Sequence, residues 1–153
     1  MIKRVFLDTG ALFAAILAPE SGARVLLRMG EAGLISLWIG RTTLREADWT
    51  LRRKAPETRL DLARLLEAAD AQIAPQPDVA ALARAAPIQA DARTRYTLAE
   101  ALAAEADYFV TLTPQRYRQG PEESTLPLRL GTPTEFLQAL RAELGQGELL
   151  KSE

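Results

Sequence analysis

Short runs of β-favouring residues alternate along this chain with longer helical patterns, and this alternation limits the fold more than any other sequence feature. The expected strands are residues 4–7, 34–39, 71–74, 108–111 and 128–130. Helical apolar stripes lie between them, for example at Leu62, Leu65, Leu66 and Ala69. Strands that alternate with helices form a mostly parallel sheet covered by helices. The sequence therefore predicts an α/β fold with about five strands.

The length of 153 residues fits one domain. We expect this domain to span residues 1–144, with Pro56 and Pro77 marking two helix starts. Its last helix is expected over Thr134 to Leu144, with a core-facing stripe of Phe136, Leu137, Leu140 and Leu144. Residues 145–153, GQGELLKSE, contain two glycines and no complete apolar stripe. We expect them to form a flexible tail.

Neither histidine nor cysteine occurs in the sequence. This excludes disulfides, thiol nucleophiles, histidine bases and serine–histidine triads. Clustered carboxylates would instead hold a hard cation such as Mg²⁺ or Mn²⁺. The net charge of −1 gives no global field that attracts nucleic acid, so RNA or DNA would need a local basic patch. We expect a cytoplasmic protein with no membrane partner, because no segment approaches the roughly 18 apolar residues of a membrane span and the first residues lack a secretory signal.

Asp8 lies where the first expected strand meets a helix. Ligands of open α/β sheets bind at the carboxyl edge, where the strands end, so Asp8 is the leading functional candidate. The alternative is that it only caps the next helix. Glu46 is the second candidate, near the start of a helix expected over residues 41–54. Its alternative role is that of a first-turn acid or of a partner for a residue four positions away.

Four segments together resemble the PIN domain, a metal-dependent nuclease fold found in many prokaryotic toxin ribonucleases and RNA-processing factors. VFLDTGALFAAIL (5–17) resembles its opening strand and helix, with Asp8 as the first metal-binding acid, and TTLREADWTLRRK (42–54) resembles its second acidic helix, with Glu46. LAEALAAEADYFVT (98–111) and GTPTEFLQAL (131–140) resemble the late and closing elements. The resemblance implies a three-layer α/β/α domain that cleaves RNA with Mg²⁺ or Mn²⁺, as the toxin of a toxin–antitoxin pair does.

The sequence departs from the family pattern at three positions. The third acid of the family corresponds to Thr94, the fourth acid or Asn to Thr113, and the Asn two residues after the first Asp to Gly10. Asp91 lies about one helical turn before Thr94 and is the candidate replacement ligand, with a helix-start cap as its alternative role. The candidate catalytic and metal-binding set is therefore Asp8, Glu46 and Asp91. Glu100 is expected to be solvated.

Arginines are expected near the same edge of the sheet, where they would contact RNA phosphates. The candidates for nucleic-acid binding are Arg41, Arg45, Arg116 and Arg118, with Arg93 and Arg95 in the same region. A solvated surface is the alternative for each of them. RNA is the expected ligand, and an antitoxin protein and a second copy of the chain are the candidate protein partners.

Two functions remain open. The leading one is a divalent-metal-dependent ribonuclease, and the alternative is a PIN-like module that has lost catalysis and binds RNA or protein. A third acid within reach of Asp8 and Glu46 separates them.

Residues 8–10 also spell the DTG of aspartic proteases, but those enzymes are nearly all β, whereas a helical pattern follows Gly10. Gly10 also takes the place of the second Asp of phosphotransferases that use an Asp nucleophile.

Overall fold

A five-stranded sheet forms the centre of the computed structural model, which describes residues 2–88, 90–117 and 126–151, with side chains described as far as Gly145. Its order is β3-β2-β1-β4-β5, and every pair of neighbours is parallel. The strands are β1 (Arg4–Leu7), β2 (Ser36–Ile39), β3 (Gln72–Ile73), β4 (Tyr108–Val110) and β5 (Arg129–Gly131). The predicted parallel sheet of about five strands is confirmed, and β1 is its central strand.

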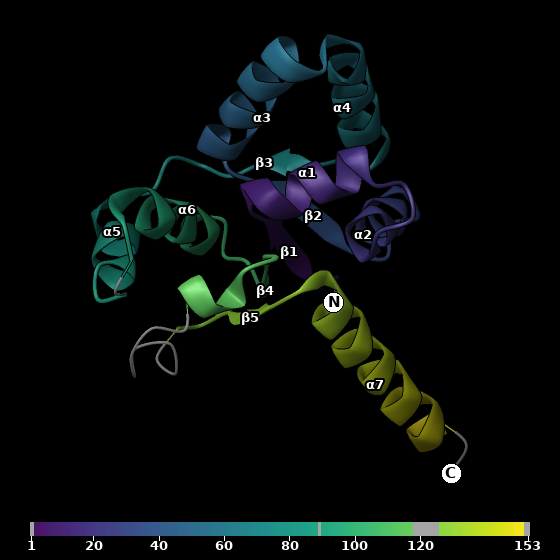
Figure 1. Ribbon diagram of the computed structural model, residues 1–153. Coiled ribbons are helices and arrows are strands. Elements are labelled where there is room, and N and C mark those ends of the chain that lie inside the picture. The colour runs from purple at the N-terminus through teal and green to yellow at the C-terminus, as the bar shows by residue number, and fades with distance from the viewer. Residues whose placement is uncertain (1, 89, 118–125, 152–153) are drawn as a thin grey trace.

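Helices cover both faces of this sheet (Figure 1). They are α1 (Thr9–Leu17), α2 (Gly22–Glu31), α3 (Arg41–Lys54), α4 (Pro56–Ala68), α5 (Val79–Ala85), α6 (Ala92–Ala103) and α7 (Pro133–Lys151), with a 3₁₀ turn η1 (Pro114–Arg116) after β4. One core contains residues of α1 to α4 and α7, and the other contains residues of α5 and α6. The three-layer α/β/α architecture is therefore confirmed.

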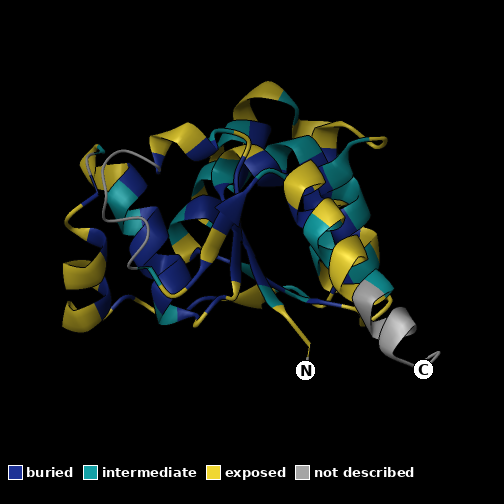
Figure 2. Cartoon of the chain, turned by 90° about the horizontal axis from the view of Figure 1, so that it is seen from below, coloured by how far each residue is buried: buried dark blue, intermediate teal, exposed yellow. Residues whose placement is uncertain are grey.

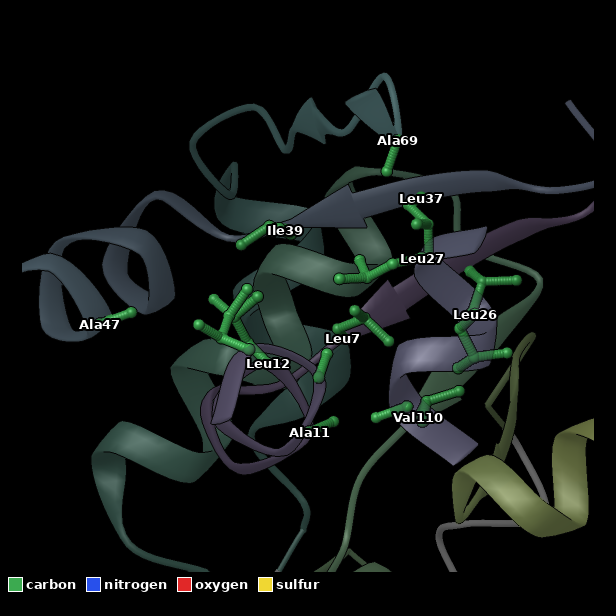
Figure 3. Close-up of a cluster of buried hydrophobic side chains, with 14 of the residues drawn as sticks. Leu7, Ala11, Leu12, Leu26, Leu27, Leu37, Ile39, Ala47, Ala69 and Val110 are labelled. Atoms are coloured by element: carbon green, nitrogen blue, oxygen red, sulfur yellow. The ribbon is translucent and has the colours of Figure 1, made fainter. Parts of the chain in front are cut away.

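The central strand β1 supplies both cores. Val5 and Leu7 belong to the first core, shown in Figure 3, whereas Phe6 belongs to the second and stacks on Phe109 with ring centroids 5.4 Å apart. Successive side chains of a strand point to opposite faces, and here both faces are covered. Figure 2 accordingly shows the central strands β1 and β4 as largely buried and the outer faces of the helices as exposed. This explains why β1 reads as an unbroken apolar run rather than as an alternating one.

Several helices begin at a side-chain cap. Ser21 caps α2, Asp78 caps α5 and Asp91 caps α6. A capping side chain accepts a hydrogen bond from a backbone N–H that has no partner within the helix. The cap at Asp78 explains why α5 begins at Val79, two residues after the helix start that Pro77 was expected to mark. The cap at Asp91 likewise starts α6 at Ala92.

Helix α7 differs most from expectation. Phe136 is buried as predicted, but Leu144 is 63% exposed and was wrongly assigned to the core-facing stripe. Figure 1 shows the reason, since the carboxyl half of α7 extends away from the sheet and has no layer to pack against. The helix continues to Lys151, past the expected domain end at residue 144. The flexibility of the tail remains a prediction.

Among the described residues, no single helix is long and apolar enough to cross a membrane, although α1 and α2 pass that test as a pair bent by 86°.

Candidate active site

A cleft of about 410 Å³ opens at the carboxyl ends of the central strands β1 and β4. Asp8 and Thr9 enter it from the end of β1, Thr113 enters from the segment after β4, and Glu46 and Arg93 enter from α3 and α6. Backbone pairing in the sheet fixes where the strand ends lie. The cleft therefore lies at the carboxyl edge of the sheet, where the sequence predicts the functional site.

Asp8 is 7% exposed and lines the floor of this cleft. Its Oδ1 accepts a hydrogen bond of 2.9 Å from the backbone N–H of Ala11, so it is also the N-cap of α1. Burial raises the pKa of the Asp8 carboxyl, while a hydrogen bond with Thr111 and the charge of Arg116 oppose that rise. The structure thus shows Asp8 in its capping role and places it in the cleft, and its metal-binding role remains a prediction.

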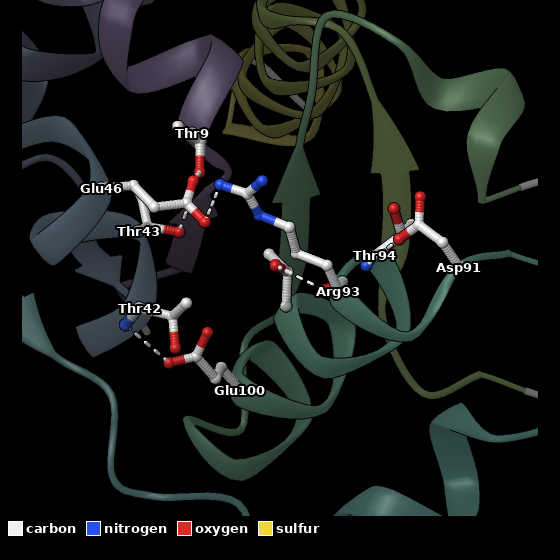
Figure 4. Close-up of polar contacts among 9 residues, drawn as sticks. Thr9, Thr42, Thr43, Glu46, Asp91, Arg93, Thr94 and Glu100 are labelled. Carbon is white, nitrogen blue, oxygen red and sulfur yellow. Dashed lines mark hydrogen bonds and ion pairs between the residues drawn. The ribbon is translucent and has the colours of Figure 1, made fainter. Parts of the chain in front are cut away.

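Glu46 extends from α3 toward the same cleft (Figure 4). Its Oε2 accepts a hydrogen bond of 3.2 Å from the hydroxyl of Thr9. Its Oε1 forms an ion pair with the guanidinium of Arg93, which reaches across from the first turn of α6. Glu46 is therefore paired with a cation on the opposite wall. It also lies beyond the first turn of α3, which contains no acidic residue, so the alternative of a first-turn acid is wrong.

Asp91 lines the cleft as the N-cap of α6. Its Oδ1 accepts a hydrogen bond of 2.7 Å from the backbone N–H of Thr94, and this bond holds the pKa of the exposed Asp91 carboxyl below its ordinary value. In Figure 4, Asp91 lies on the far side of Arg93 from Glu46. The structure thus shows Asp91 in its capping role, and its metal-binding role remains a prediction.

The donor groups of the cleft fit one divalent cation better than two. Within the described ranges, no three acidic side chains form a group that could hold a metal ion. Mg²⁺ keeps several waters and needs only one or two carboxylates from the protein, which Asp8 and Glu46 can supply. Thr94 and Thr113 add only neutral hydroxyls, which cannot offset the charge of a second ion.

The predicted arginines lie around two different hollows. Arg116 lines the cleft, together with Arg93, which was not in the predicted nucleic-acid-binding set. Arg41 and Arg45 instead line a hollow of about 850 Å³ between α3 and α4. Arg41 and Arg45 are four residues apart and therefore share one face of α3, whereas Glu46 projects from another face. The two arginines thus lie near the same strand end as Glu46 without facing the cleft. Arg118 lies outside the described residues.

Glu100 is buried, which corrects the expectation that it is solvated. It is 2% exposed, and its Oε2 accepts a hydrogen bond of 3.3 Å from the backbone N–H of Thr42 in the first turn of α3. Its Oε1 has no hydrogen-bond partner among the described residues. Burial raises the pKa of the Glu100 carboxyl, the Thr42 hydrogen bond opposes this, and the charge of Glu46 adds to the rise.

The carboxyl group of Glu100 fits into its position because the N-cap residue of α3, Gly40, has no side chain. A Cβ atom at Gly40 would lie 2.5 Å from Glu100 Oε1, so a larger residue there would displace the carboxyl group. The sequence signal was available, since Leu98, Ala99, Ala101 and Leu102 surround Glu100 and are all buried. A helix that is apolar around most of its circumference buries its charged residue as well.

Comparisons with known proteins give one family and one fold. A family model described as PIN domain matches residues 4–112. A comparison with curated protein sequences returned no match. Among solved structures, a chain of VapBC2 from Rickettsia felis, crystallised bound to a DNA fragment from their promoter, matches with a TM-score of 0.61 and 15% identity. The match covers 84% of this chain and 98% of that one, and at this identity it supports the fold alone.

Proposed function

Because the chain belongs to the PIN domain family, we propose that it is a ribonuclease whose cleft binds one divalent cation, Mg²⁺ or Mn²⁺, through Asp8 and Glu46. The observation that carries the proposal is that these two carboxylates, from different elements, line one cleft at the carboxyl edge of the sheet. Asp8 is fixed by its cap on α1, and Glu46 is held by the hydroxyl of Thr9. Both are thus positioned before any ligand arrives.

The bound cation would supply an activated water and neutralise charge on the phosphate oxygens, two tasks for which this chain has no histidine. Arg116, and Arg93 once released from Glu46, would bind the RNA phosphates from the cleft wall. The hydroxyl of Tyr117, which also lines the cleft, stays neutral, because burial raises its pKa above the ordinary value of 10.0. Activity should be weak and better with Mn²⁺ than with Mg²⁺, which is stricter about geometry.

One observation favours a second function, that of a PIN module that binds RNA without cutting it. Arg93 neutralises Glu46, and Thr94 and Thr113 supply hydroxyls where carboxylates would hold an ion. For either function we propose RNA as the ligand. An antitoxin protein is the proposed protein partner, supported by the toxin ribonucleases of this family and by the fold shared with VapBC2.

The proposal is tested by cleavage of a labelled single-stranded RNA in Mn²⁺, with Asp8→Asn as the test variant and Asp48→Asn as the control. Asn caps helices about as well as Asp, so Asp8→Asn should fold normally. The rate of RNA cleavage by Asp8→Asn should fall by more than about a hundredfold. Even the loss of a residue that only hydrogen-bonds to a metal ligand lowers activity by up to about that factor. Asp48 lies outside the cleft, paired with Arg59, and its variant should cleave RNA like the parent.

Equal cleavage by the parent and Asp8→Asn would rule out the proposed site. Binding of RNA by the parent without any cleavage in Mn²⁺ would favour the non-catalytic module.

A further inference from the structure

The ion pair between Arg93 and Glu46 joins the two walls of the cleft. Glu46 belongs to α3 and Arg93 to α6, and the guanidinium points into the space beside Thr9 (Figure 4). The Arg93 side chain is 68% exposed, whereas that of Glu46 is 23% exposed. The guanidinium can therefore leave through solvent, while Glu46 stays in the cleft wall.

The charges around the two side chains favour this ion pair, and Arg116, the other cation of the cleft, acts on Asp8 and Asp91 instead. Arg93 lies in the first turn of α6, where the helix dipole disfavours a cation. Glu46 shares its surroundings with two further carboxylates, since Asp8 lines the same cleft and the charge of Glu46 acts on Glu100. A counter-ion for Glu46 lowers this repulsion, and Arg93 is the cation that provides it in the absence of metal.

We propose that Arg93 is an internal competitor of the divalent cation, which binds Glu46 when no metal is present and must be displaced before a metal ion can bind there. A guanidinium and a metal ion that bind the same carboxylate repel each other, so each lowers the affinity of Glu46 for the other. Exposed ion pairs are weak, so the competition lowers metal affinity without preventing binding. This inference rests on the proposed metal site, but not on RNA cleavage.

The test is a calorimetric titration of Mn²⁺ into the parent, Arg93→Gln and Arg59→Gln at one ionic strength. Arg59 is the matched control, because it also pairs with an acid of α3, Asp48, and is likewise exposed, but it lies outside the cleft. Arg93→Gln should bind Mn²⁺ about twofold to fivefold more tightly than the parent, the factor that an exposed ion pair is worth. Arg59→Gln should bind Mn²⁺ like the parent.

A double-mutant cycle shows whether Arg93 acts through Glu46. Glu46→Gln should itself bind Mn²⁺ more weakly, and in that background, titrated at correspondingly higher Mn²⁺ concentration, the further change Arg93→Gln should no longer tighten the binding that remains. Persistence of the effect in that background would overturn the proposal, as would equal affinities for Arg93→Gln and Arg59→Gln or the absence of Mn²⁺ binding at millimolar concentration. Tighter binding by Arg93→Gln with no RNA cleavage by any variant would support this inference and refute the ribonuclease proposal.

Discussion

Helix α3 separates two hollows that differ in size and chemistry. The cleft on one side, about 410 Å³, is lined by acidic, hydroxyl and basic side chains at the ends of β1 and β4. The groove on the other side, about 850 Å³, lies between α3 and α4 and is lined largely by leucines and arginines. Only the smaller hollow brings carboxylates from separate elements together at strand ends. Position in the sheet is thus a better guide to this site than volume.

Two acids of α3 show how the helix divides these regions. Glu46 faces the cleft, whereas Asp48 faces the groove and pairs with Arg59 at 2.6 Å and Arg52 at 3.4 Å. Residues two apart on a helix point in nearly opposite directions, because each residue turns the helix by about 100°. The sequence shows both acids, but the packing of α3 decides which one faces the cleft.

The largest gain in activity should come from adding the missing charge to the cleft. The double variant Thr94→Asp, Thr113→Asp should raise cleavage of single-stranded RNA by on the order of tenfold or more and extend it to Mg²⁺, because added carboxylates strengthen metal binding. The control, Thr134→Asp with Gln138→Asp, adds two charges to exposed positions of α7, and its cleavage should match the parent. Tighter Mn²⁺ binding without faster cleavage would show that acid count does not limit activity.

A smaller effect is expected in the melting temperature, which Mn²⁺ should raise only while the acid on the cleft face of α3 is intact. At a Mn²⁺ concentration ten times the dissociation constant, binding to the folded chain raises the free energy of unfolding by about 1.4 kcal/mol. For a chain of this size, this corresponds to a rise of roughly 3 to 6 °C in melting temperature. Asp48→Asn should keep this shift, and Glu46→Gln should lose most of it. Equal shifts in the two variants, measured by calorimetric melting, would place the ion outside the cleft.

The buried carboxyls Asp8 and Glu100 should make stability depend on pH. Burial raises their pKa values above the ordinary 3.8 and 4.5, so the folded chain keeps protons that the unfolded chain loses. Their stabilising contribution is full below those ordinary values and is lost as pH rises through the raised ones. Denaturant melts from pH 4 upward should therefore show a weaker decline in Glu100→Gln than in the parent or in an exposed control, Glu57→Gln. An unchanged slope would mean that Glu100 does not titrate in this range.

The smallest effect is expected in the groove. Leu60 is 56% exposed there, so Leu60→Ser should change the free energy of unfolding by no more than about 0.5 kcal/mol and leave RNA cleavage unchanged. A marked loss of cleavage without a loss of stability would show that RNA also occupies the groove, and the division between the two hollows would fail.

The fold could be predicted from sequence because it depends on local periodicity. The bounds of β1 and α3 follow from the run of β-favouring residues at 4–7 and the helical pattern at residues 41–54. The position of Asp8 follows from the junction after β1. The partner of Glu46 could not be predicted, because Arg93 belongs to a distant segment that only the assembled sheet brings close. The burial of Glu100 was missed although apolar neighbours in its own helix indicated it, because the backbone that its carboxylate meets, at Gly40 and Thr42, belongs to another element.

The central claim is that Asp8 and Glu46 bind one divalent cation. A calorimetric titration of Mn²⁺ into the parent and into Asp8→Asn tests it most directly, because the two proteins differ by one charge and share the same helix cap chemistry. The account predicts weak binding of one ion per parent chain and no measurable binding by Asp8→Asn. Equal binding by the two proteins, or none by the parent, would contradict it.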